Sequence, residues 1–286
     1  MYPLLGQRTG GLPSPAMADT LASHYGSEGI VERILDALTA AGFDPDALGP
    51  DALAGVDEFH IGGRSGSQFV ADALNVGPGD HVLDVGSGIG GTARFLHRTT
   101  GASVTGVDLT PEFIDAAERL TDLIGPSKGI HYKVGSATDL PFDGNSFDAV
   151  TMIHVGMNIE DKKTMFAEMA RVARSGSTIV IYDVMLTGSG EGEITYPMPW
   201  SDTPNFSFPS PQADYEAAAT AAGLTLTSAK DHGDLALRFF NETPASPPPV
   251  TLAHLMGPEM PTMFGNAKAA VNAGLISPVI LSFATD

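Results

Sequence analysis

The chain has 286 residues, of which 43% are apolar, so it is long enough for one large α/β domain with additions or for two small domains. It contains no cysteine, which excludes disulfides, thiolate nucleophiles and cysteine-based zinc sites. Its 34 acidic residues outnumber its 15 basic ones and give a formal charge of −19, and no basic patch offsets the excess, so nucleic acid is not an expected partner.

The ends and apolar runs of the sequence carry no targeting signal. The first residues lack a basic stretch followed by an apolar one, and no apolar run approaches the length of a membrane span. We therefore expect a cytoplasmic protein without a membrane partner. The oligomeric state stays open between monomer and homodimer.

Residues 1–65 are predicted to form an N-terminal cap. Residues 1–20 are rich in glycine, proline and small side chains, which is typical of loose chain. Residues 30–38 have helical periodicity that ends near Gly42, and residues 43–65 are expected to form a loop with short turns. A second helix is expected to follow Ser65 as its capping residue and to end before a turn at residues 77–80.

From residue 81 onward, predicted strands alternate with predicted helices. The strands are expected at residues 81–85, 103–107, 130–134, 147–153, 178–183, 224–228 and 279–283, and the helices at 91–99, 110–123, 161–173 and 213–222. This rhythm with short connections indicates an α/β fold, a doubly wound, Rossmann-like and mostly parallel sheet with helices on both faces. The domain is expected over residues 66–286, with lid inserts at about 184–210 and 231–276.

A glycine loop after the first strand is the strongest functional signal. The sequence VLDVGSGIGG at residues 82–91 predicts a strand that leads into a glycine turn and then a helix, whose free N-terminal amides suit an anionic group. Asp108 lies 22 residues beyond Gly86 at the end of the second strand, where a carboxylate can accept hydrogen bonds from both hydroxyls of a ribose. The pattern therefore indicates a nucleoside-containing cofactor.

The loop alone does not choose that cofactor, because Gly86, Gly88 and Gly91 also satisfy the dinucleotide fingerprint. Three features favour S-adenosylmethionine (SAM) over a nicotinamide or flavin cofactor. Asp84 precedes the loop, where a negative charge suits an amino group better than a pyrophosphate. The sequences GSATDLPF at 135–142 and SFDAV at 146–150 follow the third strand. About 80 residues precede the glycine loop, and this segment can cover the site.

With these motifs the sequence resembles the class I SAM-dependent methyltransferases of the ubiquinone/menaquinone-biosynthesis type, over roughly residues 55–185. Asp84-x-Gly86-x-Gly88-x-Gly90 resembles their first motif and Asp108 their ribose-binding acid. The sequences DEFHIGG at 57–63, HVGMN at 154–158 and YPMPW at 196–200 are similar to those of the sarcosine/dimethylglycine N-methyltransferases. The resemblance implies a seven-stranded sheet whose last strand is antiparallel and lies near the edge.

The resemblance also implies which residues bind the cofactor. Gly86, Ser87 and Gly88 would contact the methionine part of SAM, whose product is S-adenosylhomocysteine (SAH). Asp108 and Leu109 would hold the ribose and adenine, and Ser136 and Ala137 would face the adenine. Ser136 stands where the family usually has an aspartate, so its contact with the adenine amino group should be weaker, and Asp139 is a possible substitute.

Three residues are candidates for activating the methyl acceptor. His154 follows the fourth strand at the carboxyl edge of the sheet, where ligands bind in open α/β folds. His60 and Tyr25 belong to the segment expected to cover the cofactor. Each has an alternative role in capping or packing, and Asp183 at the end of the fifth strand is expected to cap a turn.

The acceptor is expected to contact Asn158 and an apolar wall supplied by the two inserts. The candidates in the wall are Met198, Trp200 and Phe206, with Phe208, Met256, Met260 and Met263 as further members. Aromatic faces attract methylated amines, although packing within the cap is the alternative for each residue. The histidines and carboxylates show no spacing typical of metal ligands, so no metal is predicted.

These observations predict a SAM-dependent methyltransferase acting on a small molecule, with an amine nitrogen as the accepting atom. Carbon (as in a quinone-like ring), oxygen and sulfur remain alternatives. A nicotinamide oxidoreductase is a second class, although no Tyr-x-x-x-Lys pair supports it. A SAM-binding protein without catalysis is a third.

Overall fold

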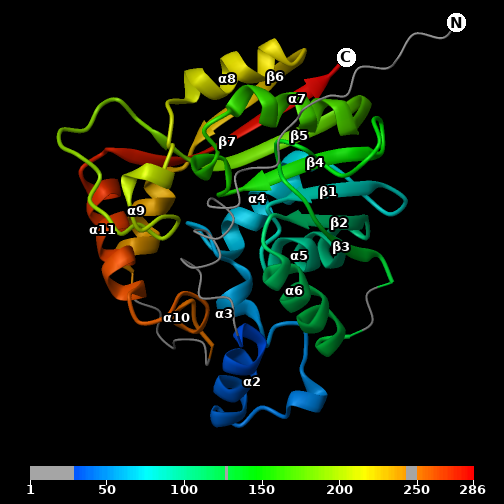
Figure 1. Ribbon diagram of the computed structural model, residues 1–286, viewed down its shortest axis with the longest axis vertical. Coiled ribbons are helices and arrows are strands. Elements are labelled where there is room, and N and C mark those ends of the chain that lie inside the picture. Colours follow the sequence, from blue (N-terminus) through cyan, green and yellow to red (C-terminus); the bar gives the residue numbers. More distant parts are fainter. Residues whose placement is uncertain (1–28, 126–127, 243–249) are drawn as a thin grey trace, which may run out of the picture.

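The protein, described by a computed structural model over residues 29–125, 128–242 and 250–286, is built around one seven-stranded sheet (Figure 1). The strand order is β3-β2-β1-β4-β5-β7-β6, and β7 is antiparallel to both of its neighbours while the other pairings are parallel. The strands are β1 (His81–Val85), β2 (Ser103–Asp108), β3 (Ile130–Val134), β4 (Phe147–Ile153), β5 (Ala173–Leu186), β6 (Leu224–Asp231) and β7 (Ile276–Thr285). The predicted fold class and the antiparallel last strand are confirmed.

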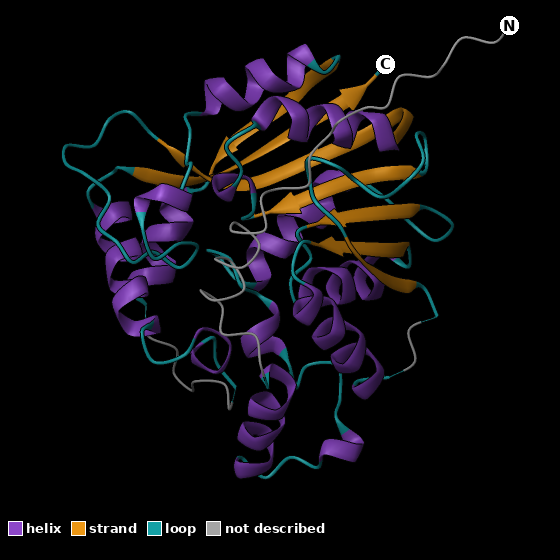
Figure 2. Cartoon of the chain, viewed as in Figure 1, coloured by secondary structure: helices purple, strands orange, loops and turns teal. Residues whose placement is uncertain are grey.

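Helices cover both faces of the sheet, as Figure 2 shows. The central strands are apolar on both faces: Leu83 and Val85 pack in the core beneath one helical layer, and Val82 packs in the core beneath the other. The first layer contains α7 (Lys162–Val172) and α8 (Gln212–Ala221), and the second contains α4 (Arg64–Leu74) and α5 (Gly91–Thr100). Burial on both faces explains why these strands read as continuous apolar runs.

A cap lies beside the carboxyl ends of the central strands and joins distant parts of the chain (Figure 1). It contains α2 (Ile30–Ala40), the short η1 (Pro45–Ala47) and α3 (Ala54–Asp57), together with α9 (Gly233–Asn241), α10 (Ala253–Met256) and α11 (Met260–Asn272). Helix α10 contacts α2, and both pack with α6 (Pro111–Leu123) in one apolar cluster that includes Ile34, Leu255 and Phe113. The N-terminal segment and the second insert therefore share a core.

Most predicted boundaries agree with the structure to within one or two residues, but the start of α4 and the lengths of β5, β6 and β7 differ, because β6 and β7 extend to Asp231 and over Ile276–Thr285. Ser65 lies inside α4, which begins at Arg64 after Gly63, so the prediction of Ser65 as a cap is wrong. Strand β5 begins at Ala173, directly after α7, where Ala173 pairs with Phe147 of β4. It extends to Leu186, because the long antiparallel β7 pairs with it beyond the apolar run. Among the described residues, no helix is long and apolar enough to cross a membrane.

A buried ion pair fixes the cap to the start of α5. Arg94 donates from Nη2 to Asp57 Oδ1 at 2.6 Å and from Nη1 to Thr121 Oγ1 at 3.0 Å, and its side chain is 5% exposed. The backbone of α3 lies so close to α5 that a Cβ on Gly91 would stand 2.0 Å from the Asp57 carbonyl oxygen. A residue larger than glycine at position 91 is therefore excluded.

We predict that Arg94→Met lowers the free energy of unfolding by about 3 to 5 kcal/mol, because it leaves the buried Asp57 carboxylate without its partner. The matched control is Arg119→Met, which removes an exposed ion pair with Glu32 and should cost less than about 1 kcal/mol. Urea denaturation followed by circular dichroism measures both. Equal losses in the two variants would contradict the structural role given to Arg94.

Candidate active site

A deep cavity lies at the carboxyl ends of β1, β2 and β4, between the sheet and the cap. Its volume is about 520 Å³, within the usual range for small-molecule sites. The loop after β1 lines one part, together with the ends of β2 and β3. The other part is lined by residues after β4 and by the cap. This is the point in the strand order where open α/β sheets bind ligands.

The glycine loop is held by hydrogen bonds to β2. The backbone amides of Gly86 and Ser87 both donate to the Val107 carbonyl, at 2.7 and 3.0 Å, and the Gly88 amide donates to Asp108 Oδ2 at 2.9 Å. Gly86 has a φ of +78°, and a Cβ there would stand 2.2 Å from Val155 Cγ2. Both the turn and the close approach of the loop after β4 therefore require glycine.

Asp108 closes this loop from the end of β2 and lines the cavity. Its Oδ1 accepts from the Thr110 amide at 2.9 Å, while Oδ2 accepts from Gly88. Burial raises the pKa of Asp108, and the two amides act in the opposite direction. The residue is half-buried at the end of β2.

Asp84 and Ser87 place polar atoms beside the loop that have no partner among the described residues. Asp84 Oδ2 and Ser87 Oγ are both buried and make no hydrogen bond within that part of the chain. Burial, aided by the nearby Asp108 carboxylate, raises the pKa of Asp84 to about 7. A buried unpaired carboxyl is costly unless a donor reaches it, so these atoms fit a ligand with an amino group.

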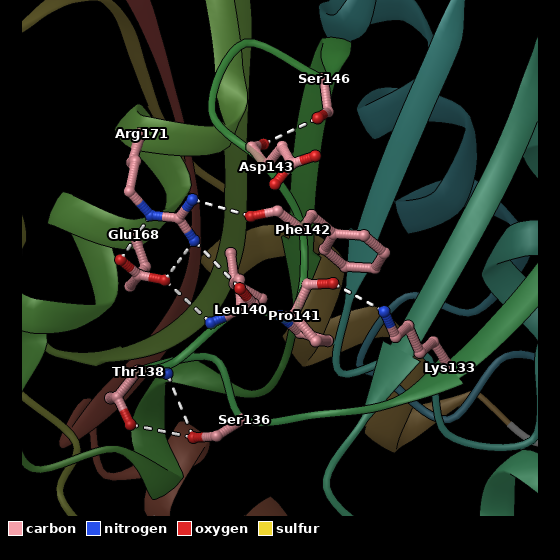
Figure 3. A network of polar contacts seen from close by, with 10 residues as sticks. All are labelled: Lys133, Ser136, Thr138, Leu140, Pro141, Phe142, Asp143, Ser146, Glu168 and Arg171. Carbon is pink, nitrogen blue, oxygen red and sulfur yellow. Dashed lines mark hydrogen bonds and ion pairs between the residues drawn. The ribbon is translucent and has the colours of Figure 1, made fainter. Parts of the chain in front are cut away.

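The segment after β3 forms the edge of the cavity through Gly135, Ser136, Ala137 and Thr138. Ser136 Oγ accepts from the Thr138 amide at 3.2 Å and contacts its hydroxyl at 2.9 Å (Figure 3). Asp139 does not line the cavity, so the structure gives no support to its substitution for the missing aspartate.

Helix α7 anchors the rest of this segment (Figure 3). Glu168 accepts from the Leu140 amide at 2.9 Å, and Arg171 donates to the carbonyls of Leu140 and Phe142 at 3.0 and 2.8 Å. Lys133 donates to the Pro141 carbonyl at 2.7 Å. Because the chain is fixed at residues 140–142, Ser136 and Ala137 are held at the strand end.

His60 and His154 meet in the other half of the cavity, with ring centroids 5.8 Å apart. His154 directly follows β4 with a φ of +52°, a strained backbone for a residue with a side chain, while its amide donates to the Tyr182 carbonyl at 2.8 Å. Its Nε2 is buried without a hydrogen-bond partner in the described ranges. Burial, and then His60, hold the pKa of His154 well below its ordinary value, so the ring is neutral at pH 7.

His60 has buried partners that the sequence did not reveal. Its Nε2 lies 3.2 Å from Glu58 Oε2 and 3.0 Å from Ser67 Oγ, and Ser67 donates to the same Glu58 oxygen. Arg64 Nε pairs with Glu58 Oε1 at 2.8 Å. Hydrogen bonds from His60 and Ser67 lower the pKa of Glu58 against the opposing effect of burial. One feature of the sequence could have indicated this network: the acidic Glu58 stands two residues before His60, which begins the HIGG sequence.

The remaining predicted site residues divide between the cavity and its surroundings. The cavity is lined by Gly86, Ser87, Gly88, Asp108, Leu109, Ser136, Ala137, His60, His154, Asn158, Trp200 and Phe206. Asp84 and Gly90 lie outside the lining: Asp84 is buried in β1, and Gly90 is the N-cap of α5. Met198 is fully buried in the core cluster that includes Trp200, so the expectation that it forms part of the wall is not met. Met256 and Met263 pack in the cap core, Met260 packs against it, and Tyr25 lies outside the described residues.

A buried network fixes the loop after β4. Tyr215 donates to Asp183 Oδ2 at 2.7 Å, and Lys162 Nζ donates to the carbonyls of Gly156, Ile159 and Phe208 at 2.6 to 3.0 Å. Burial raises the pKa of Asp183 to about 6, although Tyr215 and Lys162 lower it. Asp183 is thus a structural carboxyl behind the cavity. Its Oδ1 also accepts from the Val184 amide, as expected for a cap.

This fold and site define a Rossmann-like α/β domain with a nucleoside-type cofactor site, and comparison with known proteins narrows the class. Residues 83–181 match the family described as a methyltransferase domain. The resemblance to class I methyltransferases is therefore confirmed, whereas the ubiquinone/menaquinone detail stays a prediction.

Relatives and solved structures agree with this match. Ajmaline N-methyltransferase of Rauvolfia serpentina is 37% identical over 101 residues, which cover 35% of each chain. The chain spans about a third to a half of the length of the first curated relatives it matches.

Two solved structures share the fold. Geranyl diphosphate C-methyltransferase of Streptomyces coelicolor A3(2), solved with Mg²⁺, geranyl diphosphate and SAH, has a TM-score of 0.68 at 19% identity, covering 96% of this chain and 98% of that one. A putative sarcosine dimethylglycine methyltransferase from Galdieria sulphuraria has a TM-score of 0.59 at 20% identity, covering 77% and 82%.

The buried Asp183 predicts a pH dependence of stability. Its folded-state pKa lies near 6, above the ordinary value of 3.8, so its stabilising contribution is complete below pH 3.8 and is lost as the pH rises through 6. Relative to Asp183→Asn, the free energy of unfolding of the wild type should fall by about 2 to 3 kcal/mol between pH 4 and pH 7.

The control for this prediction is Asp161→Asn, which replaces the carboxylate that caps α7. Hydrogen bonds from Thr164 lower the pKa of Asp161, so the wild type should gain stability over this variant as the pH rises from the acid side. Urea titrations at half-unit pH intervals measure both differences. A constant difference between the wild type and Asp183→Asn would show that Asp183 does not titrate as described.

Proposed function

We propose that this chain is a SAM-dependent methyltransferase that methylates a small molecule, with an amine nitrogen as the accepting atom. One observation supports this most strongly: a glycine loop framed by Asp84 and Asp108 opens into the same cavity as the paired rings of His60 and His154. The family match over residues 83–181 supports the same activity.

The residues at the glycine loop fit the cofactor. Asp84 Oδ2 and Ser87 Oγ, both unpaired within the described residues, would receive the amino-acid part of SAM. Asp108 and Leu109 would hold the ribose and adenine, and Ser136 and Ala137 would border the adenine. Bound SAM supplies an activated methyl group, because its leaving group is a neutral thioether.

His154 is the proposed proton acceptor for the amine. An ammonium has no lone pair, so a proton must leave before nitrogen can react, and a neutral imidazole inside the cavity can take it. Burial lowers the pKa of His154, which keeps its ring neutral. Its Nε2 has no hydrogen-bond partner among the described residues, so this atom can accept the proton. His60, held by Glu58 and Ser67, packs against that ring and fixes its position.

The lid holds the acceptor and excludes water. Asn158 donates to the Trp200 carbonyl at 2.7 Å, and Trp200 Nε1 donates to Ser207 Oγ at 2.8 Å. The Phe208 amide donates to the Met157 carbonyl at 2.7 Å, which ties the lid to the loop after β4. Positioning of the amine in such a closed site can supply about 7 to 11 kcal/mol of barrier reduction.

We predict that the protein releases SAH from SAM with amine acceptors and not with matched phenols or thiols.

His154→Gln should lower kcat at pH 7 by about a hundredfold and leave SAH affinity unchanged, because only the proton acceptor is removed. The deficit should shrink as the pH approaches the pKa of the amine. Initial rates across a pH series measure this.

The matched control is His131→Gln, which alters an exposed histidine on β3 and should keep the wild-type rate. Transfer to oxygen or sulfur alone would overturn the assignment to nitrogen. Tight SAH binding with no transfer to any acceptor would favour a non-catalytic SAM-binding protein.

A further inference from the structure

Aromatic side chains dominate the acceptor half of the cavity. They come from three separate segments: the cap before α4, the lid between β5 and α8, and the helices α9 and α11. Members of this aromatic wall are Phe59, Trp200, Phe206, Phe239, Phe240 and Phe264. Phe240 stands edge-on to both Phe239 and Phe264, with centroid distances of 5.2 and 6.0 Å. The aromatic wall is thus a packed surface on the side of the cavity that the cap and the lid cover.

No lysine or arginine of the described residues lines this cavity. Three cations on elements around the cavity are engaged elsewhere: Lys162 donates to three backbone carbonyls, Arg94 pairs with Asp57, and Arg64 pairs with Glu58. Arg238 and Lys268 border a separate pocket beside Phe239, Phe240 and Phe264, and they do not line this cavity. Arg8 is the one basic residue of the sequence outside the described ranges. The rim carries acidic Glu160 and Asp161 instead.

An acceptor with a phosphate, diphosphate or carboxylate would therefore meet an unfavourable site. Its anion would lose water without gaining a cationic partner, and the cost of an unpaired buried charge is several kcal/mol or more. The described residues also contain no group of three or more histidine and acidic side chains that could hold a metal ion to bridge such an anion.

Hydrocarbon surface and cations suit the same wall. Apolar groups gain free energy when they leave water for aromatic surface, in proportion to the area buried. A protonated amine is attracted to the face of an aromatic ring. A molecule as small as sarcosine would leave most of this wall uncovered, and its carboxylate would be unpaired.

We propose that the acceptor is a bulky apolar molecule without phosphate or carboxylate, whose reactive amine is its only charged group. This inference rests on the proposed function for the choice of an amine, and it narrows the small-molecule class. It differs from the diphosphate named for the Streptomyces coelicolor structure and from the amino acids named for the Galdieria sulphuraria one.

The test compares three probes by calorimetric titration of the full chain, both alone and with saturating SAH. Geranylamine and geranyl diphosphate share one hydrocarbon chain and differ in the sign of the charged group, and sarcosine is a small amine with a carboxylate. We expect geranylamine to bind at least about tenfold more tightly than either of the others. Equal or tighter binding of geranyl diphosphate or sarcosine would overturn the proposal.

Two variants of α9 locate the binding. Phe239→Ala removes part of the wall and should weaken geranylamine binding by about tenfold or more. Leu237→Ala removes an exposed side chain of the same helix that does not line the cavity, and it should stay within about twofold of the wild type. Equal effects of the two variants would place the amine elsewhere and contradict the proposal.

The SAH titration separates this proposal from the proposed function. Failure to bind SAH would defeat the methyltransferase assignment, whatever the probes do. Normal SAH binding with a preference for the anionic probe would defeat only the acceptor class. Because the probes are also measured without SAH, their order of affinity is decided in either case.

Discussion

The carboxyl of Asp84 imposes the constraint on which the site depends. It is buried one residue before the end of β1, close to Asp108 at the end of the neighbouring β2. Burial, aided by the Asp108 carboxylate, raises the pKa of Asp84 to about 7, so Asp84 stays partly protonated at neutral pH. Asp108 is compensated by the amides of Gly88 and Thr110, whereas Oδ2 of Asp84 has no partner in the described chain. The fold thus keeps a buried acid ready for a cationic group.

The cap connects this cofactor half to the acceptor half. Helix α3 lies directly on Gly91 at the start of α5, and the residues that follow α3 bring Phe59 and His60 to the cavity. Helix α2 packs against α10, so the N-terminal segment and the second insert form one continuous cap although they are far apart in sequence. A change in either segment is therefore expected to alter acceptor binding without touching the glycine loop.

The sequence predicted the cofactor half well, because its signals are local. Strands β1, β3 and β4 match their predicted bounds, and the glycine loop and Asp108 follow directly from strand ends. The acceptor half depends on tertiary contacts that no local pattern encodes. Ser67 reaches His60 from the next helix, and Phe239 and Phe264 meet the cavity from the second insert. Met198 packs in the core instead of lining the cavity. An apolar side chain in an insert suits the core and the cavity wall equally, so the sequence could not decide between them.

We infer that the glycine loop and Asp84 hold SAM rather than a dinucleotide. Calorimetric titration with SAH at pH 6 and pH 8, with NADH as the comparison, tests it most directly. Because Asp84 must lose its proton to pair with the amino group of SAH, the affinity for SAH should rise about tenfold from pH 6 to pH 8. We expect this rise together with no binding of NADH. Binding of NADH, or SAH affinity that is the same at both pH values, would contradict it.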